Sequence, residues 1–151
     1  MPCGANINDI TCLTFHFSDI LKDMHLVRLP DAAPYTPAQH TGVRAYRLQG
    51  GEGSGEGSAG PFCSVSISYY EPDGRADMAA GPQEKIYVIL SGEISITTAP
   101  GVTAPGRTTV MRPFDSCVIA AGEAREVRNA NGSEAVLLVI TPRKTPDTAK
   151  A

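Results

Sequence analysis

The stretch KIYVILSGEISITT, residues 85–98, decides the fold class of this chain. Its two halves are rich in β-branched residues, and the Ser-Gly-Glu sequence at 91–93 separates them. Short runs of this composition, joined by a glycine-containing turn, are typical of a β-hairpin. The stretch therefore predicts two antiparallel strands, at residues 85–90 and 93–98.

Similar short runs lie on both sides of this hairpin. We expect further strands at residues 42–48, 62–70, 107–111, 116–119, 124–128 and 135–141. Turn-forming sequences divide the runs, among them PDG at 72–74, APG at 104–106 and NANG at 129–132. The 15 glycines and 12 prolines leave little helical periodicity. Short strands at this spacing predict an all-β sandwich or barrel.

Length and charge narrow the function classes. A chain of 151 residues with a net charge of −3 is the size of one ordinary domain, and its 13 basic residues are scattered. Scattered basic residues do not form the patch that a nucleic-acid-binding protein requires. The longest apolar runs are far shorter than the roughly 20 residues of a membrane span. We expect a protein without nucleic-acid or membrane partners.

The two ends of the chain differ from its centre. Residues 1–23 lack the basic start and sustained apolar core of a secretory signal, so we expect a cytoplasmic protein. This segment is either an arm or the result of a mis-assigned start, and the barrel pattern begins at Met24. We expect the barrel to occupy residues 24–143, a flexible loop at 50–60, and a flexible tail at 144–151.

Four cysteines lie far apart in the sequence. The absence of a C-x-x-C pair argues against a zinc ribbon or a redox motif. Because disulfides are rare in the cytosol, we expect Cys63 and Cys117 to be free, mostly buried thiols.

Two segments resemble the conserved motifs of the cupin superfamily. DGRADMAAGPQEKIYVILSGEISI (73–96) is similar to the first motif, and PFDSCVIAAGEAREVRN (113–129) is similar to the second. Gly92 matches the last glycine of the first motif, while Gly122 and Asn129 keep the spacing of the second. The resemblance covers about residues 40–141. It implies a single-domain, cupin-like jelly-roll β-barrel.

The metal-ligand positions of these motifs are substituted. Counting back from Gly92 places Lys85 at the family's glutamate position, and the second motif carries Arg125 at its histidine position. The first motif's two histidine positions fall near Met78 and Ala80. A guanidinium cannot ligate a metal, so we expect no metal and no cofactor.

A register shifted by one residue keeps an alternative open. It places Glu84 at the glutamate position and Asp77 at a histidine position. A metal-dependent cupin with such atypical ligands, assisted by His40, is therefore a second reading. A site of carboxylates alone suits magnesium or calcium better than iron or zinc.

Strand alternation gathers candidate site residues in the lumen. Lys85 and Tyr87 share one face of their strand, and we expect Arg125 to meet them from the second motif. These are the candidate catalytic residues, because an arginine fork, a lysine charge and a phenol suit an anionic ligand. The candidate ligand-binding residues are Arg125, Glu84, His40 and Ser66. The serine row containing Ser66 faces either the lumen or solvent.

Several functions are compatible with such a lumen. The leading hypothesis is a metal-independent isomerase, cyclase, lyase or decarboxylase acting on a small carboxylated or enolisable metabolite. A non-catalytic module that binds or senses a small anion is the alternative. In a third reading, Arg125 and Lys85 pair with nearby glutamates and plug the barrel. We also expect a homodimer, because unpaired strand edges need covering.

Overall fold

The computed structural model describes residues 24–50 and 63–142. The expectations for residues 1–23, for nearly all of the loop at 50–60 and for the tail at 144–151 lie outside these residues. The strands are β1 (Ala33–Tyr35), β2 (His40–Gln49), β3 (Cys63–Ala80), β4 (Lys85–Ser91), β5 (Ile94–Ala99), β6 (Arg107–Met111), β7 (Ser116–Ile119), β8 (Ala124–Arg128) and β9 (Ala135–Pro142), and the 3-10 turn η2 (Leu29–Asp31) precedes β1.

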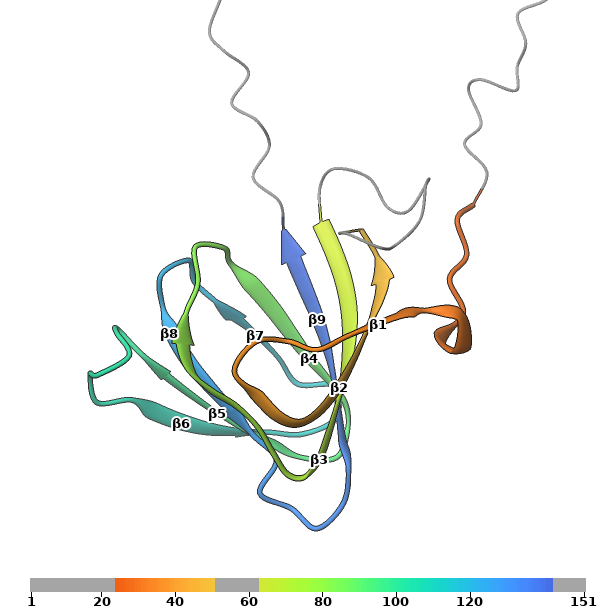
Figure 1. Cartoon of the computed structure of the whole chain (residues 1–151). Coiled ribbons are helices and arrows are strands. Elements are labelled where there is room, and N and C mark those ends of the chain that lie inside the picture. Colours follow the sequence, from red (N-terminus) through yellow and green to blue (C-terminus); the bar gives the residue numbers. More distant parts are fainter. Residues whose placement is uncertain (1–23, 51–62, 143–151) are drawn as a thin grey trace, which may run out of the picture.

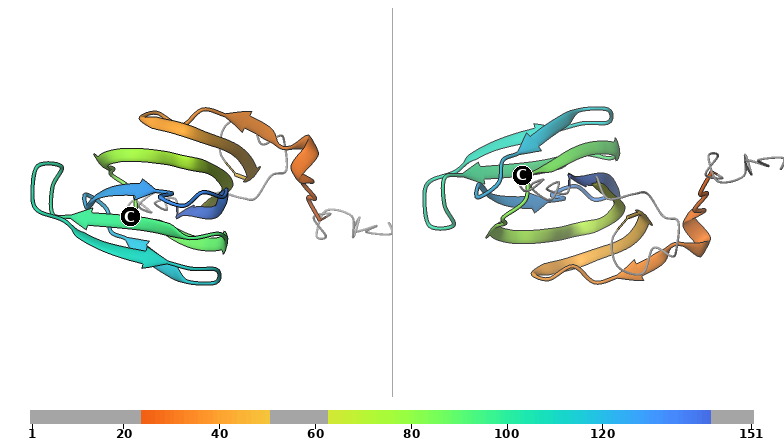
Figure 2. Two further views of the ribbon diagram at one scale, coloured as in Figure 1. Left: turned by 90° about the horizontal axis from the view of Figure 1, so that it is seen from below. Right: turned by 90° about the horizontal axis from the view of Figure 1, so that it is seen from above.

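The strands form a nearly closed antiparallel barrel, which confirms the predicted fold class (Figure 1). Their order is β6-β5-β8-β3-β9-β4-β7, while β2 pairs with β3 and β1 pairs with β2. Figure 2 shows the same barrel along a perpendicular direction, with β1 and β2 on one side. No helix within the described ranges has the length and hydrophobicity of a membrane span.

β3 connects the two walls of the barrel. Its first half pairs with β9, from Cys63 to Tyr70, and its second half pairs with β8, from Arg75 to Ala80. β2 follows the same curve beside it (Figure 1). The two motif strands β4 and β8 are thereby held on opposite sides of one lumen.

Two features of this arrangement differ from the sequence prediction. The predicted turn at 72–74 is an irregularity inside β3, where Asp73 adopts a φ of 61° and the β2–β3 register shifts. The turn residues are there, but the strand continues through them as a bulge. The edge strand β1 is absent from the prediction, because three residues that include Pro34 carry almost no strand signal.

Asn129 ties the end of β8 to the bend of β3. Its side-chain nitrogen donates to the carbonyl oxygens of Tyr70 at 2.9 Å and Glu71 at 3.1 Å. Its side-chain oxygen accepts from the backbone of Asn131 at 3.0 Å, and its own backbone N–H donates to Gly74 at 2.9 Å. Asn129 is fully buried, so these bonds satisfy a polar group that would otherwise be costly to bury.

The core lies between the two walls of the barrel. Its buried cluster consists of Tyr70, Ala76, Tyr87, Ile89, Ile94, Ile96, Met111, Ile119, Val127, Ala135 and Leu137. Gly92 turns the chain from β4 into β5 with a φ of +72°, and a Cβ there would lie 2.8 Å from Ala135. Only glycine fits this turn without displacing β9.

Candidate functional site

Arg125 is the centre of a polar group on the lumen side of the barrel. Its Nε donates to the hydroxyl oxygen of Tyr87 at 2.8 Å, across the lumen from β8 to β4. Its Nη1 donates to the carbonyl oxygen of Ala79 at 2.8 Å, on the neighbouring strand β3. Two neutral acceptors therefore fix the guanidinium, and its remaining N–H groups are left for a ligand.

Lys85 lies beside this guanidinium. Along β4, Tyr87 and Ile89 are buried, and Lys85 belongs to the same alternate set at the strand's start. Lys85 and Arg125 line one crevice. Glu84 is exposed in the turn before the strand, so the structure places Lys85 at this site and Glu84 outside it.

Burial changes the acid-base behaviour of Lys85 and His40. Desolvation, reinforced by the charge of Arg125, lowers the pKa of Lys85. Desolvation also lowers the pKa of His40, and the charges of Arg125 and Lys85 act in the same direction. His40 pairs with the buried Ala76 across β2 and β3, which directs it to the lumen side. Lys85, His40 and Arg125 therefore share one electrostatic environment.

Tyr87 is a neutral phenol at ordinary pH. Burial raises its pKa, and the nearby charge and hydrogen bond of Arg125 only partly offset this effect. Because Arg125 donates to the phenol oxygen, the Tyr87 hydroxyl hydrogen is directed elsewhere. Tyr87 can thus donate a hydrogen bond to an oxygen atom bound beside Arg125.

Among the described residues, no carboxylate forms an ion pair with Arg125 or Lys85, although Glu123 lines the same crevice. The ion pairs within residues 24–50 and 63–142 join Arg44 to Glu134, Arg75 to Asp77 and Arg112 to Glu93. Arg125 and Lys85 are in none of them. The plugged barrel with glutamate partners is therefore not the observed arrangement, and partly buried positive charge remains to be compensated.

The donor set at this position does not suit a transition metal. Cupin motifs commonly place histidines and a glutamate where Arg125 and Lys85 lie here, and two cations repel a divalent ion. Among the described residues, no group of three His, Cys, Asp or Glu side chains is placed to hold a metal. The Asp77 carboxylate instead accepts from Arg75 Nε at 3.0 Å.

Ser66 lies on the inner face of the wall that carries Tyr87, opposite the wall that carries Arg125. It pairs with Val139 of β9, and Val139 pairs in turn with Tyr87 of β4. Directly paired residues share a face, so Ser66 and Tyr87 line the same side of the sheet. The next serine, Ser68, is buried, with 4% of its surface exposed. The serine row therefore faces inward.

Two cysteines described by the structure are free, as predicted from the sequence. Cys63 and Cys117 are partly buried thiols. Cys117 pairs with Tyr87 across β4 and β7, so it is beside the site, and burial raises the pKa of its thiol.

Space at the site is limited. The crevice between Lys85 and Arg125 has a volume of about 10 Å³, room for a single water-sized group. The turns that contain Gly81 and Ala120 border this crevice at the end of the barrel. As it stands the crevice accepts one oxygen atom of a ligand, and a metabolite requires these turns to open.

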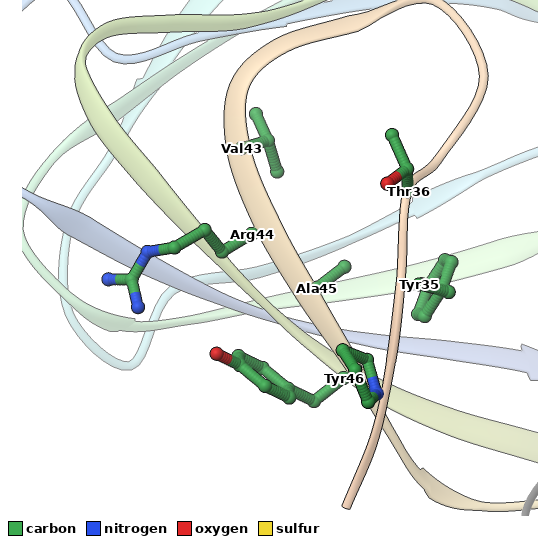
Figure 3. A pocket seen from close by; sticks show the side chains of 7 residues that line it. Tyr35, Thr36, Val43, Arg44, Ala45 and Tyr46 are labelled. Carbon is green, nitrogen blue, oxygen red and sulfur yellow. The ribbon is translucent and has the colours of Figure 1, made fainter.

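Two larger hollows lie at β1 and β2, and no sequence signal predicts them. One, of about 320 Å³, is lined by residues that include Tyr35, Thr36 and Arg44 (Figure 3). The other, of about 380 Å³, shares Arg44 with it and includes Tyr69. Arg44 is bonded to Glu134 at 2.6 Å, so its charge is already compensated. The described residues of these linings include tyrosines but no counterpart of Lys85 or His40.

Comparison with known proteins agrees with this fold. No family model matches the chain. The beta-D-galactosidase Rv1717 of Mycobacterium tuberculosis is 35% identical over 126 residues, which cover 83% of this chain and 100% of that protein. The polyketide cyclase RemF of Streptomyces resistomycificus superposes with a TM-score of 0.64 and 18% identity, covering 82% of each chain.

A further solved structure supports the fold at lower identity. An RmlC-like cupin from Shewanella frigidimarina has a TM-score of 0.60 and 10% identity, covering 82% of this chain and 95% of that one. At such identities the two solved structures establish the barrel architecture alone.

Proposed function

The chain belongs to the cupin superfamily, in the same family as the mycobacterial protein Rv1717, and from this premise we propose that it is a metal-independent enzyme acting on a small carboxylated or enolisable metabolite. The observation that carries the proposal is Arg125, held at 2.8 Å from both Tyr87 and Ala79 without a carboxylate partner among the described residues. A partly buried guanidinium that is fixed by neutral groups is prepared to bind an anion.

The proposed chemistry is proton transfer beside a carbonyl or carboxylate. Neutral Lys85 takes a proton from the carbon next to the carbonyl group, and the C–H electron pair moves to form an enolate. Arg125 holds the negative oxygen, and the Tyr87 hydroxyl donates a hydrogen bond to it. The lowered pKa of Lys85 makes its neutral form more accessible near neutral pH. Returning the proton to a different position completes an isomerisation.

Deuterium exchange tests this proposal whatever product the reaction forms. A panel of 2-oxoacids and 3-oxoacids is incubated with the protein in deuterated water, and loss of the C–H signals is followed by NMR. We expect exchange well above the uncatalysed rate for at least one acid, abolished by Lys85→Met. Binding of the panel without exchange would favour the non-catalytic anion-binding module instead.

Galactoside hydrolysis is a second candidate, favoured by the relative named as a beta-D-galactosidase. Most glycosidases place two carboxylates about 5 to 10 Å apart around the bond they cleave. In this chain Asp77 is bonded to Arg75, and a Glu123 oxygen accepts from the backbone of Ala120 at 3.0 Å. Both carboxylates lie near the lumen end that carries Lys85, which makes them the acids to test.

A chromogenic 2-nitrophenyl β-D-galactoside distinguishes the two candidates. Hydrolysis that is lost in Asp77→Asn or Glu123→Gln, but kept in Lys85→Met, would support the galactosidase reading over ours. Absence of hydrolysis together with Lys85-dependent deuterium exchange would support the metabolite reading.

The proposal includes a homodimer in the cytoplasm. β6 and β7 end the described strand order, and such unpaired edges commonly need a partner or a cover. Light scattering coupled to size-exclusion chromatography measures the mass directly. A mass of one chain across micromolar concentrations would reject the dimer.

A further inference from the structure

A second arginine lies on the inner face of the wall that carries Tyr87, opposite the wall that carries Arg125. Arg47 of β2 pairs with Ser66 of β3, in the row that continues through Val139 to Tyr87. Val139 packs against the core cluster, and Tyr87 is buried. Because directly paired residues share a face, Arg47 is on the lumen side of the sheet.

Tyr35 fixes the position of this arginine. The guanidinium carbon of Arg47 lies 4.5 Å from the centre of the Tyr35 ring, in the geometry of a cation-π contact. Tyr35 pairs with Ala45, which is 2% exposed, and Ala45 pairs with the buried Ser68. Ring and guanidinium are therefore together on the inner face, at the edge of the wall.

The Tyr35 phenol also influences the site around Arg125. The Tyr35 phenol is close enough to raise the pKa of Tyr87. Tyr87 accepts the hydrogen bond from Arg125. Two contacts, Arg47 with Tyr35 and Arg125 with Tyr87, therefore lie on inner faces of the same barrel.

Arg47 resembles Arg125 in lacking a carboxylate. None of the ion pairs within residues 24–50 and 63–142 includes it. Its cation-π contact with Tyr35 involves no hydrogen-bond acceptor, so the N–H groups of Arg47 are available to an anion. Arg44, on the opposite face of the same strand, is instead bonded to Glu134.

We propose that Arg47 and Tyr35 form a second anion-binding position across the lumen from Arg125, so that the substrate carries two anionic groups. This inference rests on the proposed function, in which Arg125 binds the first anion. Three strand spacings of about 4.8 Å each separate Arg47 from Tyr87 along this row, and two long arginine side chains shorten the gap that an extended diacid of several carbons has to cover. Arg47 then selects the length and charge of the substrate, and Lys85 acts on carbon atoms next to the first anion.

A series of ligands of increasing length tests the inference. Unbranched dicarboxylates from malonate to suberate, and monocarboxylates of equal length, are titrated calorimetrically into the full-length protein. We expect one dicarboxylate to bind roughly 10-fold or more tightly than its matched monocarboxylate, as a charge-assisted pair predicts. Equal affinities at every length in the wild-type protein would overturn the inference.

Two substitutions on β2 test whether Arg47 provides the second anion-binding position. Arg47→Gln should remove the preference for the dicarboxylate, while Arg44→Gln, on the outer face, should keep the preference. A preference that persists in Arg47→Gln would overturn the second position. If Arg47→Gln does not fold, Arg47→Lys retains the charge without the planar fork and should reduce the preference several-fold.

A different measurement tests the proposed function. It requires that Arg125→Gln weaken the binding of monocarboxylates and dicarboxylates alike. Carboxylate binding that is insensitive to Arg125→Gln would reject the first anion position, whatever the result at Arg47.

Discussion

Arg125 on β8 donates from Nε to the Tyr87 oxygen on β4 at 2.8 Å, and this hydrogen bond joins the two motif strands across the lumen. It forms where the resemblance to cupins would place a metal. The neutral phenol of Tyr87 thus accepts a hydrogen bond from one edge of the Arg125 guanidinium. Other N–H groups of this guanidinium remain available to an oxygen atom of a ligand.

Removing the phenol hydroxyl tests the role of this contact. Tyr87→Phe leaves Nε of Arg125 without its acceptor in a partly buried position, which costs about 1 to 3 kcal/mol of unfolding free energy. Carboxylate affinity should fall as well, because Arg125 is less firmly oriented. Urea denaturation and calorimetry measure the two effects. Unchanged affinity would show that Tyr87 only fills the core.

Arg125→Gln distinguishes a ligand site from a structural one. Since the guanidinium has no carboxylate partner among the described residues, its removal should change the unfolding free energy by no more than about 1 to 2 kcal/mol. Carboxylate binding should weaken by at least about 10-fold. A protein that unfolds on this substitution would contradict the account. Arg128→Gln, at an exposed position of the same strand, is the matched control.

The pH dependence of turnover reports on Lys85. Its pKa in the folded protein is below the ordinary 10.5, so the neutral base accumulates as pH rises through that lowered value. Turnover should rise over this range, and anion affinity should fall, because the positive charge of Lys85 is lost. Lys85→Met should abolish turnover and retain weakened binding. Full turnover in Lys85→Met would reject the lysine as the base.

His40 predicts a loss of stability on acidification. Burial lowers its pKa below 6.5, so between that lowered value and 6.5 the unfolded chain binds more protons than the folded protein. Stability therefore falls as pH decreases through this window. Urea denaturation across the window should show the slope, and His40→Gln should reduce it. NMR titration of the His40 ring should give a midpoint below 6.5. A midpoint above 6.5 would contradict this account.

Gly92→Ala tests the hairpin that carries β4. With a φ of +72° and Ala135 at 2.8 Å from a new Cβ, the substitution should cost about 2 kcal/mol or more. Gly101→Ala is the control, because no atom lies within 4 Å of its Cβ position. Equal thermal stability of the two variants would show that the turn relaxes without cost.

The strands that the sequence predicts best are those bounded by glycine turns. The segment at 107–111 is predicted with its observed bounds, and Lys85 and Arg125 share the lumen because strand alternation holds over both motifs. The local sequence pattern is sufficient for these strands, because a strand with one buried face alternates buried and exposed residues with a period of two.

The remaining features depend on distant contacts. The PDG sequence at 72–74 is a turn by composition, yet pairing with β2 and the hydrogen bonds of Asn129 keep it inside β3. The contact of Arg47 with Tyr35 joins residues of different strands, and no local sequence signal predicts it. The register between Glu84 and Lys85 likewise depends on the position at which β4 begins.

The NMR signal of the Arg125 Nε–H group measures the central claim most directly, because it reports whether an anion binds at this guanidinium. The signal is assigned by its loss in Arg125→Gln and followed while pyruvate, and separately zinc, are added near pH 7. The account predicts a saturable shift with pyruvate and no stoichiometric response to zinc. A signal that does not shift with pyruvate, or that responds to one equivalent of zinc, would contradict it.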